Sequence, residues 1–222
     1  MKRAFLLVAH PVKGADLISS SPVWIGQCLF LVGIGLLIHI TSFGRIVQLT
    51  MDRLPDSATP ADRQVMSEIL NGQQWVSAAL FPFRKLAGFG GTALILFLAL
   101  RGVSSGSTVH LKEIFALEVH AETVLLLGNL AAYAAVFMGS QQNPYVNPLG
   151  VSQLVEGKFD HISALNSINL FTLWYISLLV LGASRMLKLS YWKSIAAVLS
   201  TWVLMLVMEE SSFDLLRNFF HF

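Results

Sequence analysis

The 222-residue sequence has little charge and a single cysteine. Only 13% of its residues are charged and 55% are hydrophobic, whereas a soluble domain carries about 25% charged residues. Charged residues at this frequency are too few to cover the surface of a soluble protein. This argues against a soluble enzyme domain, a disordered chain and a nucleic-acid-binding protein. Because Cys28 is the one cysteine, an internal disulfide and a thiolate metal cage are both excluded. The sequence therefore predicts an integral membrane protein.

Five apolar segments are candidates for crossing the membrane. A helix needs about 20 apolar residues to cross about 30 Å of hydrocarbon. The segments are residues 22–42, 86–100, 114–138, 168–187 and 192–208. The second is short, but its flanking basic side chains can extend toward the headgroups. We expect an all-α membrane helix bundle that forms one domain over residues 1–222.

The basic residues predict the orientation of the bundle. Five spans place the two termini on opposite sides, and basic residues crowd the short segments on the N-terminal side: Lys2, Arg3, Lys13, Arg101, Lys112, Arg185, Lys188 and Lys193. The positive-inside rule then places the N-terminus in the cytoplasm and the C-terminus outside. The connections 43–77 and 139–167 are expected on the non-cytoplasmic side.

The first of these connections contains a helix start. Thr59 is the expected N-cap, Pro60 the first helical residue and Asp62 an acidic residue in the first turn. Apolar residues then recur at helical spacing. We expect an amphipathic helix that lies on the membrane or against the bundle.

Two further features concern helix packing and lipid contact. The glycines Gly88, Gly90 and Gly91 form a patch where another helix could approach closely. The basic residues Arg45, Arg84 and Lys85 are candidate contacts for a lipid headgroup, and simple anchoring at the membrane surface is the alternative.

The most polar patch near a span contains Glu118, His120 and Glu122. The two glutamates are four residues apart and share a helix face, while His120 points about 200° away from Glu118. Ionisable groups at membrane depth often mark a pathway or a partner. The patch is thus a candidate site for a cation, a proton or a partner protein. In the alternative interpretation, residues 110–122 form an interfacial helix whose polar groups face the cytoplasm.

No motif for catalysis or for a cofactor is present. The sequence lacks a nucleophile elbow, a phosphate loop and a dinucleotide-binding glycine pattern. It also lacks two histidines four residues apart with an intervening glutamate, as found in zinc proteases. We therefore expect no catalytic residues, no metal site, no cofactor and no enzymatic activity.

Three stretches give the chain a resemblance to a known family. They are Leu6-Leu7-Val8-Ala9-His10-Pro11 with Ser19-Ser20-Ser21-Pro22-Val23-Trp24; Gly90-Gly91-Thr92 with Leu111-Lys112-Glu113-Ile114-Phe115-Ala116-Leu117; and Ile168-Asn169-Leu170-Phe171-Thr172-Leu173-Trp174 with Leu181-Gly182 and Lys193-Ser194-Ile195-Ala196. Their order resembles the bacterial branch of the Yip family of multispan membrane proteins. The aspartate, glycine and proline signature of eukaryotic members is absent, and Asn169 stands where an acidic residue is expected. The resemblance implies five spans, a cytoplasmic N-terminus and a binding or scaffolding role rather than an enzyme.

Two functions follow from these observations. The first is a non-enzymatic scaffold or accessory subunit of a membrane complex, such as that of a transporter. The alternative is a small ion- or proton-coupled transporter or permease component that uses Glu118 and Glu122. The expected partners are membrane lipids and other integral membrane proteins, in a hetero- or homo-oligomer, and not nucleic acid. The expected location is the bacterial inner membrane.

Overall fold

In the computed structural model, residues 2–52, 54–55, 58–104, 109–138, 150 and 168–220 are described, with the backbone alone for residues 136 and 209–220. These residues form helices and no strand. The helices are α1 (Lys2–Ala9), α2 (Pro11–Ser20), α3 (Ile25–Met51), α4 (Pro60–Val103), α5 (Leu111–Phe137), α7 (Leu170–Leu187) and α8 (Tyr191–Phe220). Of the connection 139–167, only residue 150 lies within the described part of the chain.

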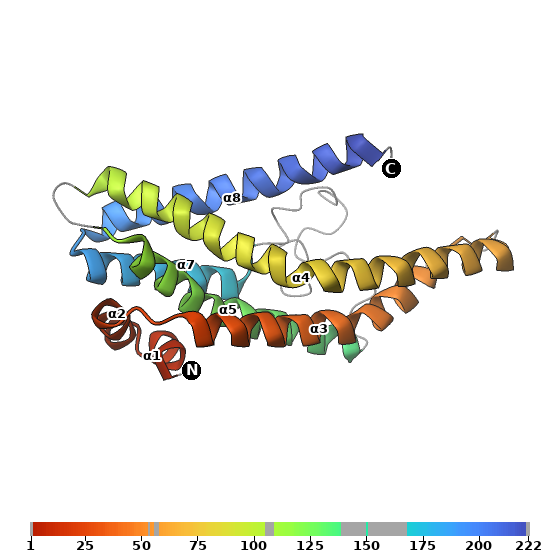
Figure 1. Ribbon diagram of the computed structural model, residues 1–222, viewed down its shortest axis with the longest axis horizontal. Coiled ribbons are helices and arrows are strands. Elements are labelled where there is room, and N and C mark those ends of the chain that lie inside the picture. Colours follow the sequence, from red (N-terminus) through yellow and green to blue (C-terminus); the bar gives the residue numbers. More distant parts are fainter. Residues whose placement is uncertain are drawn as a thin grey trace.

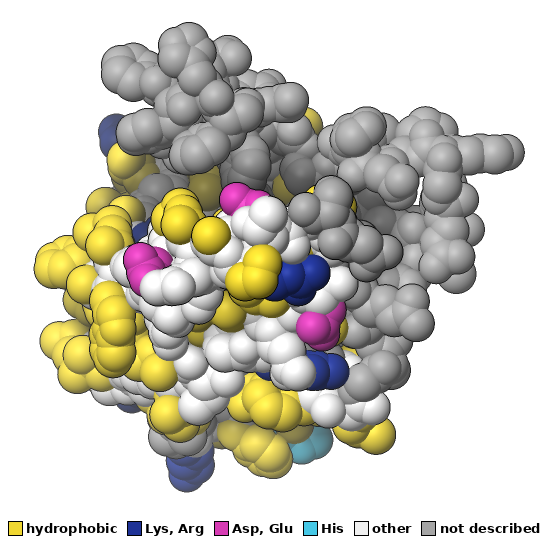
Figure 2. Space-filling view, turned by 90° about the vertical axis from the view of Figure 1, so that its right-hand side faces the viewer, with side chains coloured by type: hydrophobic (Ala, Val, Ile, Leu, Met, Phe, Trp, Pro, Cys, Tyr) yellow, Lys and Arg dark blue, Asp and Glu magenta, His cyan; other side chains and the backbone are white. Residues whose placement is uncertain are grey.

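Five helices are long and apolar enough to cross a membrane. They are α3, α4, α5, α7 and α8, and they run along the long axis of the molecule (Figure 1). The expected all-α bundle with five candidate spans is confirmed. Seen from the end where α3 and α4 meet, hydrophobic side chains gather on one flank, and charged side chains are scattered over the face toward the viewer (Figure 2).

Helix α4 differs from its prediction in length. Thr59 caps it as expected: the Thr59 Oγ1 accepts from the Asp62 N–H at 3.2 Å, and Asp62 Oδ2 accepts from the Thr59 N–H at 2.9 Å. The 44 residues that follow form one helix, about 66 Å long at 1.5 Å per residue. The expected separate amphipathic helix is therefore wrong, because this segment continues directly into the span. Pro82 lies inside the helix and removes one backbone hydrogen bond, and the helix changes direction in its middle section (Figure 1).

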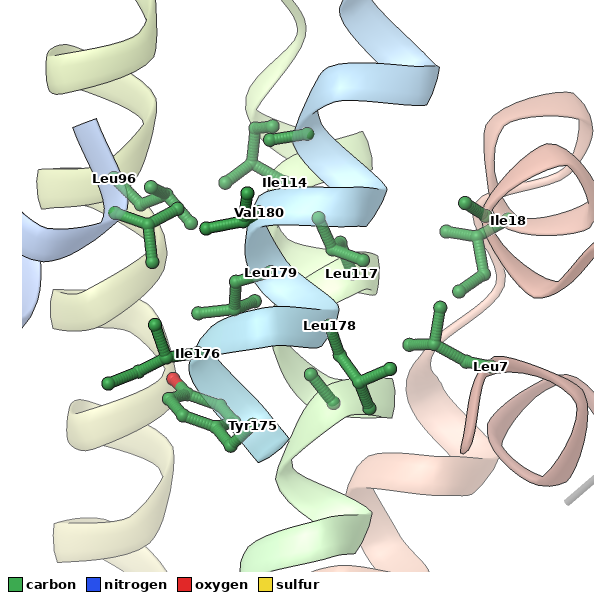
Figure 3. Close-up of a cluster of buried hydrophobic side chains, with 14 of the residues drawn as sticks. Leu7, Ile18, Leu96, Ile114, Leu117, Tyr175, Ile176, Leu178, Leu179 and Val180 are labelled. Atoms are coloured by element: carbon green, nitrogen blue, oxygen red, sulfur yellow. The ribbon is translucent and has the colours of Figure 1, made fainter. Parts of the chain in front are cut away.

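Helices α5 and α7 form the centre of the bundle. They pack against each other, α5 also contacts α1, α2, α3 and α4, and α7 also contacts α2 and α8. Figure 3 shows the core around them, to which α5 contributes Leu117, α7 contributes Leu178, and α4 contributes Leu96 on one side. These three leucines are at most 1% exposed. Burial on this scale fixes α5 and α7 against their neighbours and so positions any polar side chain between them.

The N-terminal residues form a helical hairpin of α1 and α2 that was not predicted as helical. Leu7 and Ile18 are fully buried against the bundle (Figure 3), and α2 packs on α7. The two short helices cross so closely at Gly14 that a Cβ there would overlap the Leu7 backbone. Only glycine permits this approach, and the hairpin thus covers one end of the α5–α7 core.

The glycines used for packing are not the predicted ones. A Cβ at Gly88, Gly90 or Gly91 would meet no atom of the described residues within 4 Å, so these glycines are not points of close contact between α4 and another described helix. The predicted packing role is wrong for contacts within the described chain. The close approaches instead occur at Gly128, where a Cβ would lie 2.9 Å from the Phe171 Cβ, and at Gly182, where it would lie 2.8 Å from the Leu117 Cδ2. The face of a span that meets its neighbour depends on tertiary packing, which a run of glycines alone does not reveal.

Candidate functional site

The two predicted glutamates lie inside the bundle. Helix α5 is continuous from Leu111 to Phe137, which puts Glu118 about 10 Å and Glu122 about 16 Å from its first residue. Glu118 is only 2% exposed. The interfacial-helix alternative does not account for Glu118, whose side chain faces neighbouring helices. Glu122 is 14% exposed and lines a cavity between the helices.

Glu118 is held by a tyrosine from the neighbouring span. The Tyr175 Oη lies 2.7 Å from both carboxylate oxygens of Glu118, and the hydroxyl donates to them. Tyr175 is itself only 6% exposed. A buried carboxylate and a buried hydroxyl would each be costly alone, and the bond satisfies both.

Glu122 has a different partner, on α4. The Lys85 Nζ lies 3.4 Å from the Glu122 Oε1, and the two side chains are 32% and 14% exposed. The same ammonium lies 5.6 Å from the centre of the Phe89 ring, within the range of a cation–π contact. One carboxylate of the patch is thus neutralised by a cation.

A cavity opens between α4, α5, α7 and α8 beside these residues. Its volume is about 820 Å³. Its polar and charged lining consists of Arg84, Lys85, Thr92, Glu118, Glu122, Asn129, Asn169, Thr172, Tyr175 and Thr201. Its lining from α8 is mainly apolar: Val198, Trp202, Met205, Leu206 and Met208. A cavity with both polar and apolar lining beside buried carboxylates is the arrangement expected of a binding site in a membrane bundle.

His120 lies on the opposite face of α5 and does not line this cavity. Its Nδ1 is 2.7 Å from the backbone carbonyl oxygen of Ala116, to which it donates. The side chain is 2% exposed. The helical spacing gave the direction of His120 relative to Glu118, but the prediction also included His120 in the candidate site, and the structure does not bring it to the cavity that the two glutamates line.

The three predicted headgroup contacts have three different partners. Arg45 donates to the Gln48 Oε1 at 2.8 Å. The Arg84 guanidinium lies 5.9 Å from the Phe81 ring, which stacks on His39 of α3. Lys85 points to Glu122 instead. Arg84 and Lys85 both line the cavity, and Lys85 forms the ion pair there.

Sequence reasoning missed Tyr175 as a site residue and missed the pairing of Lys85. A tyrosine hydroxyl within an apolar span requires a polar partner, and this was a usable signal. It could not name Glu118, which is 57 positions away in the chain. Lys85 could not be paired with Glu122 for the same reason.

The charges of the site leave Glu118 without a cation. Among the described residues, no Lys, Arg or His nitrogen forms an ion pair with it within 4.0 Å. Nor does the described part of the chain bring together three His, Cys, Asp or Glu side chains that could hold a metal. The site therefore has the chemistry of a carboxylate that accepts one proton or one monovalent cation.

No protein-family model matches the chain, and no curated protein or solved structure matches it at a significant level.

Proposed function

We propose that this chain is an ion- or proton-coupled component of a membrane transport system. Glu118 would bind and release the coupling cation, with Glu122 and Lys85 as its charged neighbours. The bundle would sit in the bacterial inner membrane with its N-terminus in the cytoplasm. One observation carries the proposal: Glu118 is buried beside a cavity and has no cationic partner among the described residues.

The physical argument concerns the cost of an uncompensated charge. An ionised carboxylate at membrane depth is unfavourable by several kcal/mol unless a counter-charge or hydrogen bonds stabilise it. Tyr175 supplies one hydrogen bond, which stabilises the charge without neutralising it. Binding of a proton or a monovalent cation completes the neutralisation. The adjacent cavity gives that ion access to the carboxylate.

Proton flux into proteoliposomes tests this function. We expect a potassium diffusion potential to drive acidification, reported by entrapped pyranine, above that of protein-free vesicles. Glu118→Gln should lower this flux at least tenfold, because the amide keeps an acceptor for Tyr175 but cannot take up a proton. Glu113→Gln is the matched control, since Glu113 lies on the same helix and does not line the cavity.

Two outcomes would contradict the transport function. One is wild-type flux equal to that of empty vesicles, and the other is unchanged flux in Glu118→Gln. An equal loss of proton flux in Glu118→Gln and Glu113→Gln would also contradict the transport function, because the effect would then be unrelated to the cavity.

A scaffold or subunit role is a second candidate, and the length of α4 supports it. Val65 and Leu98 are 56% and 57% exposed but lie about 50 Å apart along the helix. Both cannot face about 30 Å of hydrocarbon at once unless the helix is strongly tilted. Trp75, which lies between them, is 69% exposed. An apolar surface that extends beyond the membrane is suited to contact another protein, as the resemblance to the Yip family also implies.

Native mass spectrometry after mild solubilisation tests the scaffold role. We expect a stoichiometric complex, with a second copy or with another membrane protein, that Trp75→Ser dissociates. Leu98→Ser is the control, because Leu98 lies near the opposite end of α4. Detection of single chains alone, or of a complex that both variants leave intact, would contradict this role.

A further inference from the structure

We propose that the cavity beside Glu118 binds an amphipathic organic monocation, with an ammonium or guanidinium head and an apolar body. This inference rests on the proposed transport function and names the class of solute. It concerns the whole cavity between α4, α5, α7 and α8, of which the carboxylate forms only one part.

The size of the cavity favours an organic solute over a bare ion. A volume of about 820 Å³ falls within the range of about 300–1,000 Å³ that is typical of small-molecule sites. A proton or an alkali-metal ion would fill only a small part of this volume. A site for a divalent metal would need several more oxygen or nitrogen ligands, and the described residues form no cluster of three suitable side chains.

The part of the cavity beside Glu118 favours a solute with one positive charge. Lys85 and Glu122 form an ion pair. Arg84 also lines the cavity and keeps its charge, and its guanidinium lies 5.9 Å from the Phe81 ring, which stacks on His39 of α3. Of the two acidic side chains in the lining, Glu118 is the one without an ion pair among the described residues. A monocation would neutralise the Glu118 carboxylate. An anion would be repelled by that carboxylate, and Lys85 is already paired with Glu122.

The two walls of the cavity differ in polarity. Glu118 and Tyr175 form the polar wall, where a cationic head can donate to the carboxylate and lie near an aromatic ring. The wall contributed by α8 includes Trp202, Met205 and Leu206, which suit an apolar body. A solute with one charged end and one apolar end therefore fits the lining.

Binding of the cation should compete with binding of a proton. The titratable and charged groups that share the cavity with Glu118 are Arg84 and Lys85 on α4, Glu122 on α5 and Tyr175 on α7. Helix α8 contributes no titratable side chain to the lining within its described residues 191–208. Because Lys85 and Glu122 hold each other, Glu118 is the group at which proton and cation exclude one another. Affinity for the cation should thus fall as the pH falls.

The test is isothermal titration calorimetry on the full chain in nanodiscs, with the signal of empty nanodiscs subtracted. The probe is benzylammonium, whose N–H groups can donate to the carboxylate, and its uncharged isostere ethylbenzene is the control ligand. We expect the cation to bind and the isostere to bind at least tenfold more weakly. Glu118→Gln should raise the Kd for the cation at least tenfold, and Glu113→Gln should leave it unchanged.

A second variant acts on the apolar wall alone. Trp202→Ala removes an aromatic side chain from the lining and keeps Glu118, so it should weaken binding of the cation several-fold without removing its pH dependence. Gel filtration of each variant establishes that the fold is retained. Equal affinity for the cation and the isostere, or an unchanged Kd in Glu118→Gln, would overturn the inference.

The failures of the two proposals are distinguishable. If the wild-type chain binds neither probe while Glu118→Gln still abolishes proton flux, the organic-cation inference fails and the transport function stands. If the cation binds through Glu118 but Glu118→Gln carries protons like the wild type, the site stands and the coupling function fails.

Discussion

Replacing Lys85 with methionine is expected to destabilise the folded bundle by about 1–3 kcal/mol. Methionine keeps the length and the apolar contacts of the lysine stem but removes the ammonium that pairs with Glu122 at 3.4 Å. Glu122 is then left as a largely buried carboxylate without a cation. Loss of one partner from a fully buried pair costs about 3–5 kcal/mol, and the expected value is lower because 32% of the Lys85 side chain is exposed. Thermal unfolding followed by fluorescence-detected gel filtration measures the change.

A double variant and a matched ion pair make this prediction specific. Adding Glu122→Gln to Lys85→Met should recover most of the lost stability, because the unpaired charge disappears. The exposed pair of Arg185 with Asp16, at 3.7 Å and with side chains 49% and 60% exposed, supplies the control. Arg185→Met should cost less than about 1 kcal/mol, as surface ion pairs do. Equal losses of stability in Lys85→Met and Arg185→Met would contradict the prediction, because the Lys85–Glu122 ion pair would then contribute no more than an exposed ion pair.

Replacing Gly182 with alanine is expected to cost about 1–3 kcal/mol through overpacking. The added Cβ would lie 2.8 Å from the Leu117 Cδ2 and closer still to its other methyl carbon. Leu117 is fully buried between α5 and α7, so its side chain has little space into which it can move. The same thermal measurement on the purified chain reports the loss.

Other residues of the chain supply control variants for Gly182→Ala. Gly90→Ala and Gly91→Ala introduce methyl groups into open space and should be neutral or stabilising by about 0.5–1 kcal/mol through helix propensity. Leu117→Ala alone should destabilise by about 2–5 kcal/mol because it leaves a cavity. The double variant Leu117→Ala with Gly182→Ala should be more stable than the sum of the two losses predicts. Strict additivity would mean that the two side chains do not meet.

Local features were predictable because they depend on residues close together in the chain. The N-cap at Thr59 follows from three residues, Thr59, Pro60 and Asp62, and the structure confirms its hydrogen bonds. The common face of Glu118 and Glu122 follows from their spacing of four, and both line one cavity. The length of α4 was not predictable from its apolar run, because Gly72 and Pro82, residue types that commonly end or kink a helix, lie before the span and do not end the helix.

The partners within the candidate site depend on the packing of helices that are far apart in the sequence. Tyr175 reaches Glu118 across 57 positions, and Lys85 reaches Glu122 across 37. Each pair forms because α4, α5 and α7 pack side by side and are rotated about their own axes so that these side chains meet. The sequence of a single span does not determine that rotation. The hairpin of α1 and α2 is similar, since its short helices are stabilised by burial of Leu7 and Ile18 against the bundle.

The sequence by itself determined that the chain is a membrane bundle with five candidate spans, and that two carboxylates share one face of the third. Hydropathy and helical spacing suffice for this because both are properties of one helix at a time. Only the tertiary structure decided that this face is turned inward, that Tyr175 and Lys85 meet it, and that a cavity lies beside it. These properties arise from the packing of one helix against another, where close contacts such as Gly182 with Leu117 select a single arrangement.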